Sequence, residues 1–474
     1  MKLWAGLAAA GILATAAPPV LAQAPAPQPR PDQLAFRDLY KELVETNTTL
    51  SVGDCTAAAA KMQTRLKAAG FADADLVLFS PLVNPRWGGL VAVLHGTDPK
   101  AKALLLLAHI DVVEAKREDW VRDPFKLTEE NGVFYGRGAS DDKAEASVWV
   151  DSLIRMKTEG YKPRRTIKMA LTCGEETSEN FDGADWLAKN RRDLIDAEFA
   201  LNEGAGGRLD EAGHYIALNV QDGEKVYQNF KLETTNAGGH SSIPIRDNAI
   251  YHLAGGLARL QNYDFPVRLN DGNRAYFNGM SALVGGEVGA AMKAVAADPN
   301  NAAAAAIVSR DRSWNSMLRT TCVATLLSGG HAPNALPQRA GANVNCRIFP
   351  GQSVEDVRQT LIQVLNDPAI SVSVVQPESP TPGPPPLTAQ VLEPIQKSAA
   401  KIWPGVPVVP MMSTGATDGI YLTQAGIPTY GVSGFFVDPA GSGAHGLNEH
   451  IRVQSLYEGR DFLYGLIKLY AMQK

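Results

Sequence analysis

The sequence has few cysteines and no excess of charge, and both features exclude classes of protein. Its four cysteines, Cys55, Cys173, Cys322 and Cys346, form no Cys-x-x-Cys pair, which argues against a thiolate zinc knuckle or a thioredoxin-type motif. Strand-like residues flank Cys322 and Cys346, so a disulfide between them and two buried free thiols are equally open. A net charge of −5 over 474 residues gives no footprint for nucleic acid or an anionic membrane, and favours small neutral or zwitterionic substrates.

Long apolar runs are also lacking after the N-terminus, so we expect no stable membrane insertion. An Ala/Leu-rich stretch to Val20, followed by small residues, predicts a signal peptide over residues 1–22 with cleavage after Ala22. An uncleaved anchor is the alternative, but the run is shorter than the ~20 residues of a spanning helix and contains Pro18-Pro19. We therefore predict an exported protein, periplasmic or secreted, in which residues 23–33 form a disordered spacer.

The length of the chain predicts two domains, each with a core of its own. Between the first two of four apolar runs, the segment Ala144–Met156 has helical spacing of its large apolar residues. Strand, helix and strand in this order predict an α/β domain whose mostly parallel sheet is covered by helices. The four predicted strands are Ala103–Ala108, Ile167–Thr172, Phe199–Leu201 and Ile427–Val432.

An α+β insertion is predicted from about Lys225, where the pattern changes to alternating strands such as Val226–Thr234 and Ala342–Ile348. The helix Ala249–Leu260 lies between them, and the alanine run Ala302–Ala306 predicts another helix. A proline-rich linker over 380–386 returns to the first domain. The predicted ranges are 34–224 for the first part of the catalytic domain, 225–379 for the insertion and 380–474 for the second part.

Polar residues follow the predicted strands directly. His109 and Asp111 follow the first strand, Glu175 and Glu176 the second, and Glu203 the third. Ligands of open α/β sheets bind outside the carboxyl ends of the strands, so these residues are expected to meet in one crevice. One of the paired glutamates should hold a metal ion while the other stays free, because isolated charges at a buried strand end are costly.

Two further segments supply possible metal ligands. The glycine-rich turn Gly136–Lys143 opens a helix and leaves Asp141 near its N-terminus, with Asp142 as an alternative ligand and helix capping as the ordinary explanation. His445 follows later, in Ala444-His445-Gly446. Two imidazoles and three carboxylates without sulfur suit a pair of Zn²⁺ ions, with Co²⁺ or Mn²⁺ as substitutes.

The order of these motifs resembles the M20 family of zinc-dependent exopeptidases and amidohydrolases, over nearly the whole chain after the spacer. The resemblance implies a zinc-exopeptidase-like catalytic domain, an inserted lid or dimerisation domain, and a homodimer. It also implies that Asp141 bridges two ions, one held by His109 and Glu203 and the other by Glu176 and His445.

Catalytic roles follow from the same resemblance. Asp111 would orient His109, as a carboxylate can by accepting the second ring N–H of a metal-bound imidazole. Glu175 would be the general base that takes a proton from water and passes it to the leaving nitrogen. His240, in Gly239-His240-Ser241-Ser242, would reach into the partner subunit's site and stabilise the oxyanion.

Substrate contacts are implied at three positions. Asn334 and Arg347 match lid residues that hold the substrate carboxylate, for which a forked guanidinium is suited, although a surface ion pair explains Arg347 equally well. Gly415 lies in a glycine-rich loop that would line the substrate pocket, and a plain strand-to-helix turn would also explain its glycines.

These residues predict hydrolysis of an amide bond in short peptides or N-acyl amino acids by water activated between two zinc ions. Relatives with Glu at the position of Glu203 are carboxypeptidase-like or deacylating, whereas Asp is frequent in dipeptidases and aminopeptidases, which remain an alternative. A serine amidase that uses Ser140 and Lys143 is a second alternative, although its companion motifs are missing. A non-catalytic zinc- or peptide-binding protein is the third, and the presence of Glu175 argues against it.

Overall fold

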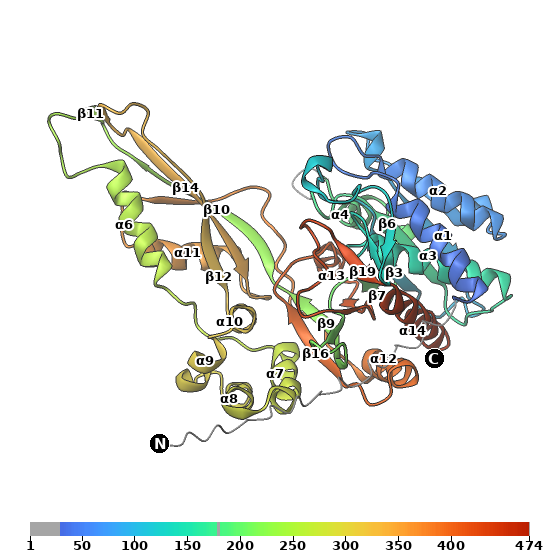
Figure 1. The fold of residues 1–474 in the computed structure, drawn as a ribbon. Coiled ribbons are helices and arrows are strands. Elements are labelled where there is room, and N and C mark those ends of the chain that lie inside the picture. Colours follow the sequence, from blue (N-terminus) through green and yellow to red (C-terminus); the bar gives the residue numbers. More distant parts are fainter. Residues whose placement is uncertain (1–28, 178–180, 474) are drawn as a thin grey trace, which may run out of the picture.

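A computed structural model describes residues 29–177 and 181–473 and has two lobes (Figure 1). The predicted signal peptide and most of the predicted spacer lie outside the described residues. Helix α1 (Pro31–Val44) includes the last three residues of the predicted spacer, 31 to 33. A proline in the first turn, Asp32 near the helix N-terminus and the buried Phe36 favour a helix there, so the disordered spacer cannot extend to residue 33.

The first lobe contains a mixed sheet with parallel strands at its centre. Strands β6, β3, β7 and β17 pair in parallel, and antiparallel strands flank them on both sides. The predicted α/β fold is confirmed, with the antiparallel flanks as an addition. The order is β1 (Leu76–Phe79), β2 (Gly89–Leu94), β6 (Ile167–Thr172), β3 (Leu104–His109), β7 (Phe199–Asn202), β17 (Thr429–Gly431), β9 (Tyr215–Glu224), β8 (Gly207–Leu209) and β18 (Phe436–Val437), and β16 (Val408–Ser413) also pairs with β9.

Helices bury both faces of this sheet. Leu104 and Leu106 of β3 belong to one core cluster, and Leu105 and Leu107 belong to another on the opposite face, as strand alternation requires. One face is covered by α1, α2 (Cys55–Ala68), α3 (Lys143–Thr158), α12 (Ala389–Ile402) and α14 (Val453–Ala471), and the other by α4 (Gly183–Asn190), α5 (Arg192–Ile195) and α13 (Gly419–Gln424).

The second lobe contains an antiparallel sheet that is covered on one face. Helices α6 (Ala249–Gln261) and α11 (Val354–Leu365) share a core with alternate residues of β10, such as Phe230 and Leu232. The edge strand β12 instead exposes Leu326 and Leu327, which are 70% and 72% accessible. The strand order is β12 (Thr321–Gly329), β14 (Arg339–Ile348), β10 (Val226–Thr235) and β15 (Ser371–Val374).

The helices between residues 271 and 318 pack against the first lobe although they lie in the predicted insertion. Tyr276 and Phe277 of α7 share a core with Ala217 of β9 and Val409 of β16. The insertion is therefore not one separate body, because its helices extend the covering of the large sheet. These helices are α7 (Asp271–Val284), α8 (Gly286–Ala297), α9 (Ala302–Val308) and α10 (Arg312–Leu318).

Two small sheets complete the described part of the fold. Strands β11 (Gly239–His240) and β13 (Ala335–Leu336) pair at the outer end of the second lobe (Figure 1). Strand β19 (His450–Arg452) pairs with β5 (Val133–Tyr135), which pairs with β4 (Thr128–Glu130). Among the described residues, no helix combines the length and the apolar character needed to cross a membrane.

All four cysteines form disulfides. Cys322 pairs with Cys346 at directly opposed positions of β12 and β14, which resolves the open alternative in favour of the disulfide. Cys55 of α2 pairs with Cys173, just before the predicted base Glu175 and the predicted metal ligand Glu176. Sequence analysis missed this second bridge, because 118 residues separate its cysteines and no local pattern relates them.

Candidate active site

The carboxyl ends of three parallel strands bring the predicted site residues together. His109 is the last residue of β3, and Glu203 directly follows β7. Glu175 and Glu176 follow β6 after a tight turn at Gly174, whose φ is +102° and whose added Cβ would lie 2.0 Å from a backbone oxygen. A residue with a side chain would force this turn to move, so glycine is required to aim the two glutamates into the crevice.

Asp141 lies between two imidazoles. Its Oδ1 is 3.1 Å from Nε2 of His109, and its Oδ2 is 3.2 Å from Nε2 of His445. Glu203 Oε1 lies 3.6 Å from the same nitrogen of His109, and Glu176 Oε2 lies 2.8 Å from that of His445. The five residues therefore form two groups that share the carboxylate of Asp141, called the ligand groups below because their members are the predicted metal ligands.

The neighbouring acid does not take the place of Asp141. Asp142 is only 3% accessible and lies at the start of α3, and the peptide bond between the two residues is cis. Among the described residues, Asp141 and not Asp142 contacts both imidazoles. Asp141 is therefore the acid of this pair that faces the two histidines.

Charge is concentrated in this buried crevice. Burial raises the pKa of Glu203 to about 7, and the nearby His109 only partly offsets that effect. Hydrogen bonds to Asp141 and Glu176 raise the pKa of His445 to about 10. Burial also opposes ionisation of Asp141, but its contacts with His109 and His445 outweigh burial and lower its pKa. Oxygen and imidazole donors gathered in this way fit divalent cations that prefer N and O ligands.

Asp111 contacts the ring nitrogen of His109 that faces away from the cluster. Its carboxylate Oδ1 lies 3.5 Å from Nδ1, and its backbone oxygen lies 3.1 Å from the same nitrogen. Its Oδ2 accepts a hydrogen bond from the backbone N–H of Glu176 at 3.1 Å. Asp111 therefore connects the ligand groups through both of these residues.

Glu175 lies beside the cluster and faces an open cavity. Oxygen and nitrogen atoms of Glu175, His109 and Glu203 lie within 4.8 Å of one another. Burial raises the pKa of Glu175, and the charges of Glu203 and Glu176 raise it further. The cavity has a volume of about 400 Å³ and includes Arg347 and His445 in its wall. The carboxylate of Glu175 thus lies between the ligand groups and the cavity.

Arg347 reaches this cavity from the second lobe. Its guanidinium lies over the ring of Tyr227, 4.8 Å from the ring centroid, and burial lowers its pKa. The structure therefore favours a place in the cavity wall over the surface ion pair that the sequence left open.

The other two lid residues lie away from this cluster. His240 is exposed in β11 at the outer end of the second lobe (Figure 1), and its Nδ1 accepts a hydrogen bond from Ser242. Asn334 lies in the adjacent turn, where its backbone oxygen accepts from Ser241. Neither residue lines the cavity of its own chain. Gly415 is also exposed, and the following Ala416 and Thr417 line the cavity instead.

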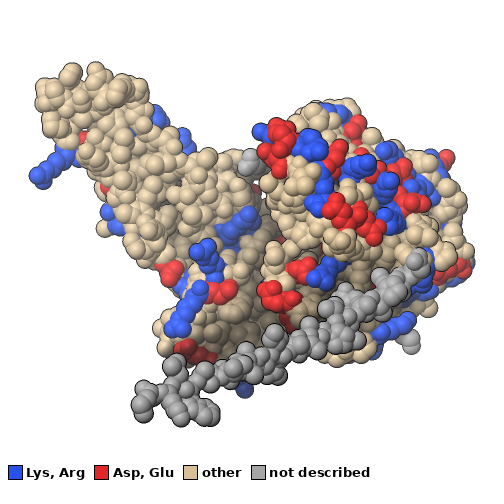
Figure 2. Space-filling model, viewed as in Figure 1, with Lys and Arg blue, Asp and Glu red and all other residues tan. Residues whose placement is uncertain are grey.

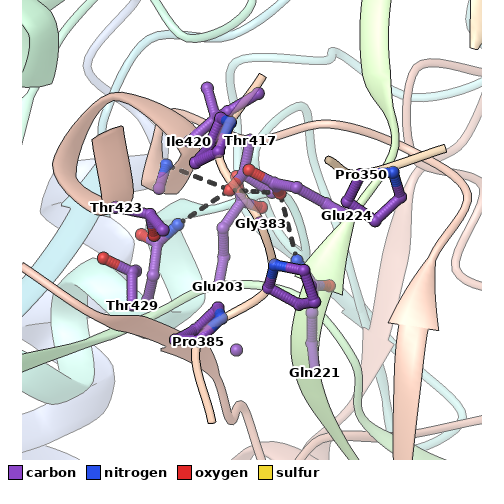
Figure 3. Close-up of a pocket in the computed structure, with 16 residues that line it drawn as sticks. Glu203, Gln221, Glu224, Pro350, Gly383, Pro385, Thr417, Ile420, Thr423 and Thr429 are labelled. Carbon is purple, nitrogen blue, oxygen red and sulfur yellow. Dashed lines mark hydrogen bonds between the residues drawn. The ribbon is translucent and has the colours of Figure 1, made fainter. Parts of the chain in front are cut away.

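Several buried acids behind the ligands were missed. Glu224 lies near Glu203 and accepts hydrogen bonds from Thr417 and Gln221 (Figure 3), and burial raises its pKa to about 8. Asp418 accepts a hydrogen bond from the Thr172 side chain. Another missed acid, Glu449, contacts the turn that carries Asp141. Glu224 is the last residue of β9, Asp418 follows a glycine-rich loop and Glu449 directly precedes β19, but such positions are common, and no motif distinguished them.

Comparison with known proteins assigns the chain to a family. The model described as peptidase family M20/M25/M40 matches residues 105–469. The chain belongs to this family. It is therefore a metallopeptidase or amidohydrolase, as the sequence predicted, and the hydrolase class is confirmed.

Similar proteins carry two kinds of name. The chain is 28% identical over 384 residues to the human N-fatty-acyl-amino acid synthase/hydrolase PM20D1, which covers 79% of this chain and 75% of that protein. It is 28% identical over 295 residues to carboxypeptidase S of Saccharomyces cerevisiae, which covers 58% of this chain and 50% of that protein.

Solved structures support the fold. An M20 family metallo-carboxypeptidase from Sulfolobus solfataricus, Sso-CP2, superposes with a TM-score of 0.70 at 21% identity, over 92% of this chain and 99% of that one. The Bacillus subtilis YXEP protein, titled a dinuclear metal-binding peptidase from the M20 family, gives a TM-score of 0.57 at 12% identity, over 92% and 98%.

Proposed function

We propose that this protein hydrolyses an amide bond in N-acyl amino acids or short peptides, with release of a C-terminal amino acid, using two Zn²⁺ ions. The observation that carries the proposal is the position of Asp141, whose two oxygens face the two imidazoles. A carboxylate so placed would serve as a ligand to both ions of a metal pair.

The ligand assignment follows the two groups. His109 and Glu203 would hold one ion, Glu176 and His445 the other, and Asp141 both. Asp111 would keep the ring of His109 oriented through its contacts at Nδ1. When bound, such a metal pair lowers the pKa of a shared water and polarises the scissile carbonyl. Zinc fits these donors, and Co²⁺ or Mn²⁺ could replace it.

Glu175 would act as the general base. It takes a proton from the attacking water and donates it to the nitrogen of the leaving amine, so the amide C–N bond breaks while a C–O bond forms. Its position beside His109 and Glu203, at the edge of the cavity, supports this role. Burial and neighbouring acids raise its pKa, which favours proton uptake near neutral pH.

Arg347 would bind the carboxylate of the substrate. Arg347 lines the same cavity as Glu175 and Glu176, so a carboxylate bound to its guanidinium would place the preceding amide toward the ligand groups. The names of the relatives, an N-fatty-acyl-amino acid synthase/hydrolase and a carboxypeptidase, both describe substrates with a free carboxylate beside the amide bond.

His240 would act in the partner subunit of a homodimer. Because His240 and Asn334 lie at the outer end of the second lobe, they cannot contact this chain's own cluster without a large movement. The edge strand β12 offers unpaired backbone groups and exposed leucines on the same lobe. A dimer through this lobe would bring the tip of one chain to the cavity of the other. Gly415 stays proposed only as part of the loop beside the cavity.

The N-terminal residues would direct export. The apolar run and the small residues before position 22 support a cleaved signal peptide. Two disulfides in the described chain agree with an oxidising compartment.

The serine amidase alternative receives no support from the geometry. Lys143 is fully buried, and its ammonium donates a hydrogen bond to the backbone oxygen of Thr46. A lysine in that position is not available to activate Ser140 for attack on a substrate in the cavity.

A panel of N-acyl amino acids and dipeptides, assayed with chelator-treated protein and with added Zn²⁺, Co²⁺ or Mn²⁺, tests the proposal. We expect no turnover after chelation, recovery with about two ions per chain, and faster cleavage of substrates with a free C-terminal carboxylate than of their amides. Full activity in the chelated protein, or loss of activity to serine-directed reagents, would contradict it.

A further inference from the structure

Glu449 is a buried acid that no motif assigned, and it holds the turn that carries Asp141. Its Oε1 accepts hydrogen bonds from the backbone N–H groups of Ser140 and Asp141, at 2.8 and 3.0 Å. Its Oε2 accepts from the N–H of Gly138, at 2.9 Å, and from Nη1 of Arg137, at 2.8 Å. Four donors therefore surround one fully buried carboxylate.

The same ion pair is connected to the segment that carries His445. Nη2 of Arg137 donates to the backbone oxygen of Gly446, the residue after His445, at 2.9 Å. The backbone oxygen of Glu449 accepts from the N–H of Gly136 at 3.1 Å. Arg137 is 3% accessible, and its guanidinium also lies 5.1 Å from the ring centroid of Trp120. Two loops far apart in sequence are thus joined at one buried point.

The two ligand groups differ in how their residues are supported. His109 and Glu203 lie at the ends of β3 and β7, which pair with each other in the centre of the sheet. His445 instead lies in an exposed loop, with 58% of its side chain accessible. Glu449 and Arg137 connect the turn that carries Asp141 to the loop that carries His445.

We propose that Glu449 is a positioning residue that sets the affinity for the ion bound by Glu176, His445 and Asp141. The inference rests on the proposed two-metal function. Glu449 itself does not touch the ion or the substrate. It holds the turn of Asp141 and, with Arg137, the loop of His445, so that the two side chains stay in contact. The ion at His109 and Glu203 keeps two ligands on paired strands and depends on Glu449 much less.

Substitution of Glu449 by Gln is the sharpest change, because it keeps the shape of the side chain. A carboxamide can accept at only one of its two ends, so two of the four donors would lose their acceptor whichever way the amide points. Unpaired buried donors are costly, and the turn would shift to find water or another acceptor. The loss falls on Asp141 and His445 rather than on the strand-held residues.

Titration of the metal-free protein with Co²⁺ alone, followed by its visible absorption, separates the two ions. We expect two ions with similar affinity in the parent. In the Glu449→Gln variant, we expect the first ion to bind within about threefold of the parent and the second to bind roughly 10- to 100-fold more weakly, the range for loss of a supporting residue. Turnover should recover as the Co²⁺ concentration is raised.

A second buried ion pair supplies the control. Nε of Arg460 donates to Asp151 at 2.8 Å, and both residues are buried in the same lobe without contact with the ligand groups. Asp151→Asn should lower the melting temperature of the metal-free protein and leave both Co²⁺ affinities unchanged. If Glu449→Gln does not fold, Arg137→Gln, which keeps the three backbone bonds of Glu449, should weaken the second ion by a smaller factor.

Three results would overturn the proposal: an unchanged second affinity in Glu449→Gln, an equal weakening of both ions, or the same weakening in Asp151→Asn. A parent that binds no pair of ions would instead remove the proposed two-metal function, and the Glu449 proposal with it. The parent titration thus distinguishes failure of the function from failure of the role of Glu449.

Discussion

The two sheets of this protein differ in how much of each is buried. Strand β3 of the large sheet is buried along its whole length, whereas seven consecutive residues of β12 in the smaller sheet are exposed. The two lobes also differ at the surface, because charged side chains crowd the visible face of the first lobe and are sparse on that of the second (Figure 2). Buried strand ends can hold acids with shifted pKa values, while an exposed sheet can meet a partner.

The largest effect is expected in the first lobe, from Glu175→Gln. Removal of a general base should lower turnover by roughly 10²- to 10⁴-fold, because the amide cannot take the proton of the water. Metal content and melting temperature should stay at the parent values, since Glu175 is no proposed ligand. Steady-state kinetics with elemental analysis measures both, and unchanged turnover would refute this assignment.

A somewhat smaller loss of turnover is expected from His240→Ala in the second lobe. Loss of one oxyanion donor should lower turnover by roughly 10²- to 10³-fold, with little change in metal content. The two variants offer a test of action between subunits. A mixed dimer of His240→Ala and Glu175→Gln chains would contain one site with both intact residues, so part of the turnover should return. Absence of recovery in verified mixed dimers would place His240 outside the partner's site.

Arg347 of the second lobe lines the cavity together with residues of the first lobe, and its loss should affect substrate binding more than the chemical step. Charge-assisted hydrogen bonds contribute about 1.5–3 kcal/mol, so Arg347→Met should raise KM by roughly 10- to 100-fold for substrates with a free carboxylate. Substrates whose carboxylate is amidated lack this contact and serve as the control. An equal rise in KM for both substrate types would argue against carboxylate binding by Arg347.

The smallest effect concerns Lys225, the single residue between β9 and β10. Burial lowers the pKa of its ammonium to about 7, and the nearby Arg347 adds to this. In the unfolded chain the value is about 10.4, so between these two pH values the unfolded state binds more protons and stability rises with pH.

Lys225→Met should remove this dependence. The free energy of unfolding of the parent, minus that of the variant, should rise by up to about 1.4 kcal/mol per pH unit above pH 7. Urea unfolding of both proteins at pH 6, 7, 8 and 9, without metal, measures the difference. A constant difference over this range would show that Lys225 stays charged at the junction of the lobes.

Much of the first lobe could be predicted from the sequence, because its central strands and the polar residues that follow them form local sequence patterns. Apolar runs identified the central strands, and parallel pairing required His109, Glu175 and Glu203 to meet at one edge. The Cys55–Cys173 bridge and the contacts of Glu449 depend on residues more than 100 positions apart. No periodicity or spacing encodes such pairs, so they became visible only in the folded chain.

For the second lobe, the sequence predicted strands and a helix correctly but did not predict how its helices pack. Strands β10 and β14 and helix α6 lie where alternation and helical spacing placed them. The packing of α7 on β9 and β16 was not foreseen, because an amphipathic helix reveals its apolar face but not the sheet that covers it.

Only Lys225 separates β9 of the large sheet from β10 of the second lobe, so a change of backbone angle at this residue would reorient the whole of β10. Strand β10 extends ten residues from Lys225, a length of about 33 Å at about 3.3 Å per residue. A rotation of about 10° at Lys225 would move the far end of β10 by roughly 6 Å over this length. Small angular adjustments at one amino acid are therefore amplified into large displacements at the histidine-bearing tip.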